Sequence, residues 1–280
     1  MEHITKSQIK LIRSLQHKKF RDETGLFVAE GEKCVSELSK AFETVMIVNR
    51  ENATEKEIEQ MSSLRTPQGV IGVFRKRGTE EPRNCGTEEL TELPILVLDG
   101  VQDPGNLGTI IRTADWFGLT DIVCSKDTAD CYNPKVVQAT MGSLARVRVH
   151  YTDVGEWVRG EKSLNGLNSL KGLRGSKSSR SSRGSKSLKS LRSLSDAGGQ
   201  GIEGEIPIYG LQLDGRDIYA EPLTKDAIIV MGNEGNGISE EVRQLVTHPL
   251  CIPTFRKGDH AESLNVAVAT AITLSELSRR

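Results

Sequence analysis

The sequence predicts an α/β protein made of two units, of which the second contains a parallel sheet. In the first ninety or so residues, short apolar strands alternate with short helices, and from Pro94 onward longer apolar strands are each followed by a helix. This alternation is typical of parallel sheets, because each crossover helix returns the chain to the same edge. The length of 280 residues also favours two units, since single domains usually span about 100 to 200 residues.

The first unit is expected over residues 1–90. It opens with an amphipathic helix over residues 4–19, in which Lys and Arg alternate with apolar residues, so that one face is basic. The remaining elements are a strand, a helix, a strand, a helix and a strand, expected at 26–29, 32–40, 44–48, 54–63 and 69–74. The charged segment 75–89 contains Gly and Pro and indicates a linker.

The second unit is expected over residues 91–280. Its strands are predicted at 95–100, 121–125, 145–150, 206–213, 227–232 and 251–255. Its helices are predicted at 106–118, 134–144, 239–246 and 261–277. The last helix is apolar around most of its circumference, so we expect it to be buried, either in the core or in a subunit interface.

A tandem triplet repeat interrupts the second unit at residues 162–194. Lys or Arg recurs at every third position from Lys171 to Arg192, and Gly and Ser dominate the rest. A period of three matches neither a helix nor a strand, and no face carries enough apolar surface to order the chain. We expect residues 160–203 to form a disordered basic insertion, which either holds RNA phosphates or is a neutral expansion of a crossover loop.

Composition restricts the classes of function. The formal charge is −1, so any nucleic acid must be bound by local patches of charge. The five cysteines are far apart, and no His or Cys stands at zinc-ligand spacing, so we expect reduced thiols and no metal. The N-terminus lacks the apolar core of a signal peptide, and no apolar run approaches the roughly 20 residues of a membrane span. These features predict a cytoplasmic protein without a membrane partner.

The first motif is LDGVQDPGNLGTIIRTAD, at the end of the strand that precedes Asp99. Asn106 stands where a helix N-cap is expected, and Asn is a favoured cap. Arg112 then lies nearly two turns into the helix and faces the carboxyl ends of the strands, where open α/β sheets bind ligands. Taken alone, Arg112 is more typical of a solvated surface charge.

The second motif is IIVMGNEGNGIS, in which an apolar strand runs into a glycine-rich turn containing Gly232 and Glu234. Glycines permit unusual backbone angles and a close approach to a ligand. The glycine order is GxxGxG, unlike the dinucleotide fingerprint GxGxxG, and no acidic residue follows at the expected ribose-binding distance. A dehydrogenase is therefore disfavoured, and a glycine turn without a ligand stays open for this segment alone.

The third motif is CIPTFRKGDHAESLNVAVA, which leads from a strand through a polar loop into the last helix. Ser263 and Asn265 stand near the start of that helix, where their side chains can cap it or bind a ligand. His260 lies between acidic neighbours, but a lone loop histidine is more often an exposed bystander than an acid-base catalyst.

Together and in this order, the motifs resemble those of the SpoU (TrmH) family of RNA ribose 2'-O-methyltransferases, which read NLGxIxRTA, MGNEGxGIS and IPxxGxxESLNVxVA. The match covers residues 95–280. The segments KKFRDETGLFVAEG and PQGVIGVF also resemble the family's small substrate-binding domain. The resemblance therefore extends over nearly the whole chain.

The resemblance implies a parallel-sheet methyltransferase domain with a C-terminal trefoil knot, preceded by a small α/β RNA-binding domain. It implies S-adenosylmethionine as the methyl donor, no metal, and a homodimer through the terminal helix. By correspondence with the motifs, donor contacts fall on Gly232, Ile252 and Leu264. The catalytic positions fall on Asn106, Arg112, Glu234, Ser263 and Asn265.

The resemblance gives Arg112 the central catalytic role. The family's proposals use this Arg as a base, but a guanidinium has a pKa above about 12 and hardly loses its proton. We expect it to grip a neighbouring phosphate and to stabilise the developing alkoxide.

Other functions stay open at this point: an RNA-binding protein that keeps the fold without catalysis, an enzyme that methylates a base, and a transfer RNA ribose methyltransferase. The five intact polar positions and the SLN pattern favour a ribose methyltransferase. Structured RNA is the expected substrate, and the separate front domain favours ribosomal over transfer RNA.

Overall fold

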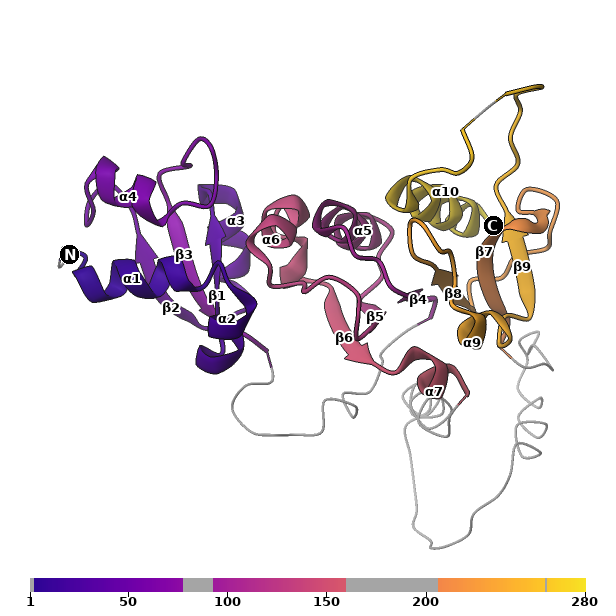
Figure 1. Ribbon diagram of the computed structural model, residues 1–280, viewed down its shortest axis with the longest axis horizontal. Coiled ribbons are helices and arrows are strands. Elements are labelled where there is room, and N and C mark those ends of the chain that lie inside the picture. Colours follow the sequence, from indigo (N-terminus) through magenta and orange to yellow (C-terminus); the bar gives the residue numbers. More distant parts are fainter. Residues whose placement is uncertain (1–2, 78–92, 160–205, 260) are drawn as a thin grey trace, which may run out of the picture.

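The computed structural model describes residues 3–77, 93–159, 206–259 and 261–280. At one end of the molecule lies a small unit built on a three-stranded antiparallel sheet of order β1-β3-β2 (Figure 1). Its strands are β1 (Leu26–Glu30), β2 (Thr44–Val48) and β3 (Ile71–Arg75). Its helices are α1 (Lys6–Ser14), α2 (Lys18–Thr24), α3 (Glu32–Leu38) and α4 (Glu55–Met61). The predicted alternation of helices and strands is confirmed.

The single helix predicted over residues 4–19 is wrong, because the chain forms two helices there. Thr5 caps α1 through a capping box with Gln8, and the helix ends at Ser14. The chain then turns, and the Arg21 guanidinium on α2 donates hydrogen bonds to the carbonyls of Leu15 and Gln16, at 2.8 and 2.9 Å. These bonds satisfy carbonyls at the end of α1 that have no partner within the helix.

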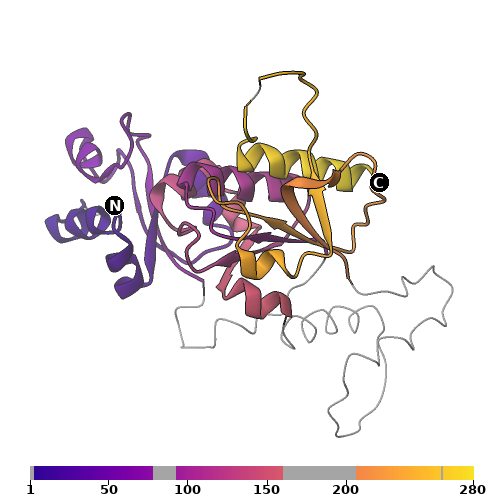
Figure 2. The same cartoon turned by 45° about the vertical axis from the view of Figure 1, so that its right-hand side comes forward.

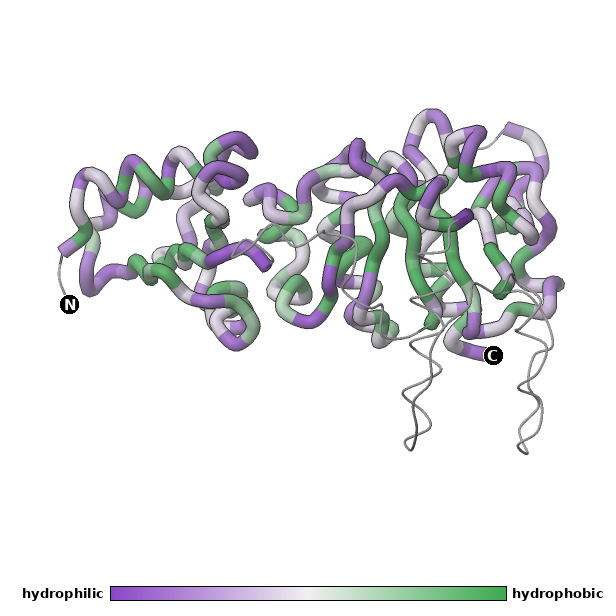
Figure 3. The backbone as a smooth tube through the Cα atoms, turned by 90° about the horizontal axis from the view of Figure 1, so that it is seen from below, coloured by the Kyte–Doolittle hydropathy of each residue, from purple (hydrophilic) through white to green (hydrophobic). Residues whose placement is uncertain are grey.

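The second unit is built on a six-stranded sheet of order β6-β5-β4-β8-β7-β9, in which every pair of neighbours is parallel. The strands are β4 (Ile95–Leu98), β5 (Asp121–Ser125), β6 (Arg148–Thr152), β7 (Ile208–Asp217), β8 (Ile228–Met231) and β9 (His248–Cys251). The predicted parallel sheet is confirmed. Figure 3 shows its central strands as the most apolar part of the chain, as expected for strands covered on both faces.

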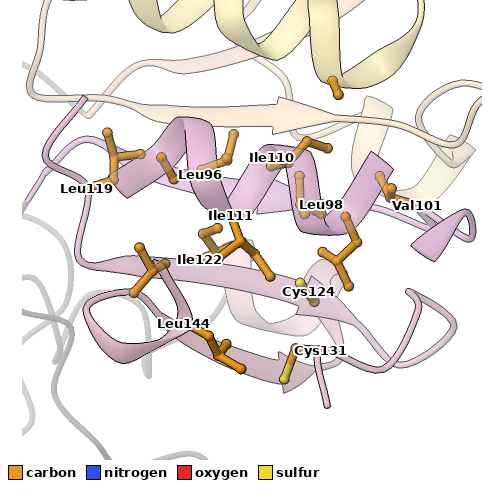
Figure 4. Close-up of a cluster of buried hydrophobic side chains, with 14 of the residues drawn as sticks. Leu96, Leu98, Val101, Ile110, Ile111, Leu119, Ile122, Cys124, Cys131 and Leu144 are labelled. Carbon is orange, nitrogen blue, oxygen red and sulfur yellow. The ribbon is translucent and has the colours of Figure 1, made fainter. Parts of the chain in front are cut away.

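Helices cover both faces of this sheet (Figure 2). One face packs against α5 (Pro104–Trp116), α6 (Pro134–Thr140) and α10 (Val266–Arg279), and the other against α7 (Val154–Arg159) and α9 (Glu240–Arg243). Strand β4 shows why both faces are filled: Leu96 and Leu98 point into the α5 side, shown in Figure 4, whereas Ile95 and Val97 point to the other. All four are fully buried.

Several predicted boundaries in the second unit differ from the structure, among them those of β6, β9 and α10. A 3₁₀ turn (Ser143–Ala145) takes the residues before β6, so that strand begins later than predicted. Strand β9 is His248–Cys251, so it overlaps the strand predicted at 251–255 only at Cys251, its last residue paired with β7. Helix α10 begins at Val266, after Asn265, and not at residue 261. The segment between β9 and α10 is thereby longer than predicted.

The two units are joined by a buried contact. Arg21, whose side chain is 2% exposed, places its Nη2 2.7 Å from Asp130 Oδ2 in the loop before α6. Beside it, the ring of Tyr132 packs against Phe27 and Phe42, with centroids 4.7 and 6.3 Å away. An ion pair and an aromatic cluster therefore hold the small unit against the parallel-sheet unit.

Several sequence predictions lie wholly or mostly outside the described ranges. These are the linker, most of which falls in residues 78–92, the insertion at 160–203 and His260. Cys34, Cys124, Cys131 and Cys251 carry free thiols. Within the described ranges, no helix is both long and apolar enough to cross a membrane, and no three His, Cys, Asp or Glu side chains gather to hold a metal ion.

Candidate active site

A pocket of about 560 Å³ lies where the carboxyl ends of β7, β8 and β9 meet the start of α10. Most of its lining residues come from four stretches of chain, 211–214, 231–238, 251–252 and 262–269. The three predicted donor-binding residues Gly232, Ile252 and Leu264 all line it. Glu234 and Ser263 line it as well, so the second and third motifs converge on one cavity.

The glycine-rich turn after β8 is braced by its own backbone. Asn233 and Gly237 exchange two backbone hydrogen bonds of 2.9 Å, which close the turn. A Cβ on Gly232 would lie 2.2 Å from the carbonyl carbon of Gly237, so the close approach of these two backbones requires glycine at 232. The pocket wall at this point is therefore backbone rather than side chain.

The side chain of Asn233 holds the turn to the first motif. Its Oδ1 accepts hydrogen bonds from the N–H groups of Gly235 and Asn236, and its Nδ2 donates to the carbonyl of Gly100 at 2.7 Å. Asp99 acts similarly, since its Oδ2 accepts from the Ser239 N–H at 2.7 Å. Neither role was predicted, because both depend on contacts between segments more than a hundred residues apart.

The prediction that Asn106 caps α5 is wrong. Asp103 is the N-cap, and its Oδ1 accepts a hydrogen bond from the Asn106 N–H at 2.8 Å. Pro104 occupies the first helical position, where a missing N–H costs nothing, and this was the sequence signal for a cap at Asp103. The correction matters for the site, because the Asn106 side chain is free for other contacts.

Asn106 links the three motifs. Its Nδ2 donates to Glu234 Oε1 at 3.0 Å, and its Oδ1 accepts from Asn265 Nδ2 at 2.9 Å. Asn265 in turn caps α10, because its Oδ1 accepts from the N–H groups of Ala267 and Val268. A chain of hydrogen bonds thus runs from the Glu234 carboxylate to the start of α10, and it fixes the orientation of both amides.

The carboxylate of Glu234 lies at the start of α5. The N–H groups of Gln102 and Asp103 both point to it at 3.4 Å, in addition to the amide of Asn106. The amino end of a helix carries partial positive charge, which stabilises a carboxylate there. Three hydrogen bonds therefore hold the Glu234 side chain at the rim of the pocket.

Arg112 is not part of this cluster. It lies six residues after Asn106, which places it about 9 Å further along the helix and roughly 120° around it. Its side chain is exposed, and within the described ranges the guanidinium has no hydrogen bond or ion pair. The structure therefore brings together Asn106, Glu234 and Asn265, with Ser263 on the same pocket, and leaves Arg112 on the outer face of α5.

The pocket residues fit S-adenosylmethionine. The volume is within the range of about 300 to 1,000 Å³ typical of small-molecule sites. Apolar walls from Leu211, Ile238 and Leu264 suit a flat base, and Glu234 and Glu262 suit the positive charge of a sulfonium. The backbone wall required at Gly232 leaves N–H and C=O groups for polar contacts.

The fold and the site define the class: a parallel α/β protein whose pocket lies at the carboxyl ends of its strands, with motif side chains clustered at its rim. Residues 94–174 and 174–275 match the SpoU rRNA Methylase family, and residues 6–59 match the MRM3-like substrate binding domain. The chain therefore belongs to the SpoU rRNA methylase family.

Individual relatives match over almost the full chain. A 23S rRNA (guanosine(2553)-2'-O)-methyltransferase of Bacillus subtilis is 28% identical, over 99% of this chain and 98% of the relative. A TrmH-family structure from Porphyromonas gingivalis is 33% identical, with a TM-score of 0.72, over 99% of this chain and 98% of the other. An AdoMet-bound rRNA methyltransferase from Sinorhizobium meliloti is 26% identical, with a TM-score of 0.72, over 100% and 97%.

Proposed function

We propose that this protein transfers a methyl group from S-adenosylmethionine to a ribose 2'-hydroxyl of ribosomal RNA. The observation that carries the proposal is the convergence of the three motifs: Glu234 and Ser263 line one pocket, and Asn106 and Asn265 join Glu234 in a hydrogen-bonded chain. The AdoMet-bound relative supports the donor, and the Bacillus subtilis relative supports ribose methylation of ribosomal RNA.

The residues of this chain would act mainly by alignment. The donor, when bound against Gly232, Ile252 and Leu264, supplies a methyl group that its sulfonium already activates. The work of the protein is then to place a ribose oxygen in line with that methyl group, and such positioning lowers a barrier by several kcal/mol. Asn106, Ser263 and Asn265 are the proposed orienting groups, and Glu234 fixes Asn106.

Arg112 is proposed to contact the RNA rather than the donor. Its exposed guanidinium, free of partners in the described ranges, is available to grip a phosphate with two hydrogen bonds. From that position it would stabilise the developing alkoxide, while the proton leaves to phosphate or water. A literal base at this position is disfavoured by the high pKa of a guanidinium.

The basic face of α1 is the proposed docking surface for RNA on the first unit. Lys6, Lys10 and Arg13 are exposed on it, and together with Ile9 and Gln60 they line a shallow hollow beside α4. Since the whole chain carries a charge of −1, such local patches must supply the attraction for phosphates. A docking unit separate from the catalytic one favours ribosomal over transfer RNA.

We further propose a homodimer formed through α10, and a trefoil knot near the C-terminus, as the family resemblance implies. Val268 is half-exposed in the first turn of α10, so an apolar side chain is available there for a partner copy. Sedimentation of the purified protein, with a mass of 30.7 kDa per chain, tests the dimer directly. A cytoplasmic location is proposed, because the proposed substrate is ribosomal RNA.

Mass spectrometry of ribosomal RNA from cells with and without the protein tests the proposal. One ribose methyl group should disappear when the protein is absent and return when it is restored. Calorimetry with S-adenosylmethionine distinguishes this function from that of an RNA-binding protein that keeps the fold without catalysis, because such a protein need not bind the donor. Loss of a base methyl group instead would show that the fold is used for a different acceptor.

A further inference from the structure

We propose that Phe255 and Tyr219 form an aromatic platform that stacks a nucleobase of the substrate RNA beside the donor pocket. The inference rests on the proposed function and adds to it a recognition element on the methylase unit itself. The ligand is a single-stranded stretch of RNA, in which an unpaired base can present its flat face.

The platform lies at the edge of the sheet that carries the pocket. Tyr219 follows the carboxyl end of β7, and Phe255 follows the carboxyl end of β9, two strands that pair in parallel through Asp217 and Cys251. Phe255 comes three residues after Ile252, which lines the pocket. The chain after β9 projects away from the body of the molecule in both views (Figures 1 and 2), so a base on Phe255 would meet little obstruction.

The two rings are already in contact, and both remain open to solvent. Their centroids are 6.4 Å apart with an angle of 31° between the planes. Phe255 is 86% exposed and Tyr219 is 41% exposed, so Phe255 offers most of its ring and Tyr219 part of its ring to a ligand. Every base has a π-face, and stacking on an aromatic side chain is a common way to bind single-stranded nucleic acid.

The charges around the rings favour RNA over a second copy of the chain. Arg256 and Lys257 follow Phe255 directly, both are exposed, and within the described ranges their side chains have no partner. The side chain of Arg216 is 70% exposed, and its distance to Glu221 is 3.6 Å. Asp217, one of the two acids two residues from Tyr219, accepts a hydrogen bond from the Tyr219 N–H at its Oδ1, at 2.8 Å, and the other is Glu221.

Lysine and arginine beside exposed aromatic rings suit a phosphate backbone. Interface cores are enriched in aromatic residues and arginine but depleted of lysine, so Lys257 beside Phe255 is the feature that favours RNA over a partner copy. In addition, the segment that carries Phe255 is longer here than in the family pattern IPxxGxxESLN, so the platform belongs to this chain rather than to the shared motif.

The test uses three substitutions of Phe255 in the full-length protein. The probe is a fluorescein-labelled single-stranded RNA oligonucleotide of mixed sequence, and its affinity is measured by fluorescence anisotropy. Phe255→Ala should weaken binding by roughly tenfold or more, as expected for the loss of one stacked base. Phe255→Trp should restore affinity, whereas Phe255→Leu, which is apolar but not aromatic, should not. Val45→Ala, which trims an exposed apolar side chain in the other sheet, is the matched control and should change nothing.

Two further measurements separate the possible outcomes. Phe255→Ala should raise the KM for RNA with little change in kcat, and should leave S-adenosylmethionine affinity and sedimentation unchanged. Equal RNA affinity for all Phe255 variants, or dissociation of a dimer by Phe255→Ala, would overturn the platform. If the wild-type protein methylates no ribose but the Phe255 series still follows the predicted order, the proposed function fails and the platform stands.

Discussion

At the scale of single residues, the site depends on which of two neighbouring polar side chains caps α5. Asp103 takes the cap, and the amide of Asn106 is thereby released to join Glu234 and Asn265. Asp103 thus has a structural role and Asn106 a proposed catalytic one. Substitutions of the two residues should therefore have different effects.

Asp103→Ala is expected to lower stability without disabling the site. Loss of an N-cap side chain costs about 1 kcal/mol, which thermal unfolding will detect as a lower Tm. Asn106→Ala should do the reverse, with a nearly unchanged Tm and a greatly reduced rate of methyl transfer, since it breaks the link between Glu234 and Asn265. Similar loss of turnover in both variants at a temperature well below both Tm values would contradict the division.

Arg112→Ala should lower turnover by about a hundredfold or more, because one charge-stabilising donor is usually worth that much. The affinity for S-adenosylmethionine, measured by calorimetry, should stay nearly intact, since Arg112 does not line the pocket. Arg112→Lys keeps the charge but loses the bidentate grip, so it should recover only part of the rate. Wild-type turnover in Arg112→Ala would refute the assignment.

At the scale of elements, the amino ends of β5 and β6 are joined by a buried carboxylate. Asp121 accepts hydrogen bonds from Arg148 and His150, each at 2.8 Å, and its side chain is 1% exposed. Burial alone would raise the pKa of Asp121, but the hydrogen bonds from His150, Arg148 and Thr120 outweigh it, so the pKa lies well below its usual value. This cluster is at the opposite edge of the sheet from the pocket.

Asp121→Asn is expected to destabilise the protein at neutral pH by about 2 kcal/mol, the usual worth of hydrogen bonds to a charged group. Because the carboxyl group has a lower pKa in the folded than in the unfolded chain, its contribution is complete above about pH 4 and is lost as the pH falls further. The difference between wild type and variant in urea unfolding should therefore be constant from pH 7 to 5 and shrink below about pH 4. A difference that persists undiminished at pH 2 would contradict this account.

The sequence predicted the elements well where apolar runs end in turn residues. Strands β2 and β5 match their predicted ranges to the residue, because sheet pairing and the apolar run end together there. Strand β9 does not, since Ile252 continues the apolar run but lines the pocket instead of pairing with β7. An apolar side chain signals burial, and sequence alone does not distinguish burial in a sheet from burial against a ligand.

The candidate site was predictable only where its residues belong to a local sequence motif. The motifs placed Gly232, Glu234 and Ser263 correctly near one another, through the resemblance. The bracing roles of Asp99 and Asn233 depend on partners at Ser239 and Gly100 in other segments, and no local pattern encodes them.

At the scale of the whole molecule, the junction between the units sets where a docked RNA would stand relative to the pocket. The Arg21 guanidinium makes four hydrogen bonds there, two to Asp130 and two to the end of α1. Separating the small unit from the rest would leave Arg21 or Asp130 as a buried charge without its partner. The junction therefore holds the small unit in a fixed position.

Arg21→Met keeps the length of the side chain but removes its charge and donors. We expect a loss of about 3 kcal/mol in stability, because Asp130 is left largely buried without a partner. Donor affinity should be unchanged, and the KM for ribosomal RNA should rise as the small unit loses its fixed position. Arg21→Lys is the matched control and should recover part of the stability. An unchanged KM in a folded Arg21→Met protein would show that docking and catalysis do not depend on this junction.

The donor pocket is assembled from residues 211–214, 231–238, 251–252 and 262–269, all of which follow the small unit and strands β4 to β6 in the chain. The small unit and strands β4 to β6 are complete long before, and domains fold from the N-terminus during synthesis. A nascent chain would therefore gain its proposed RNA-docking surface before it has a place for the methyl donor. A chain that stops short of residue 262 lacks the last part of the pocket wall, so we expect it to be unable to bind the donor even where its small unit is folded.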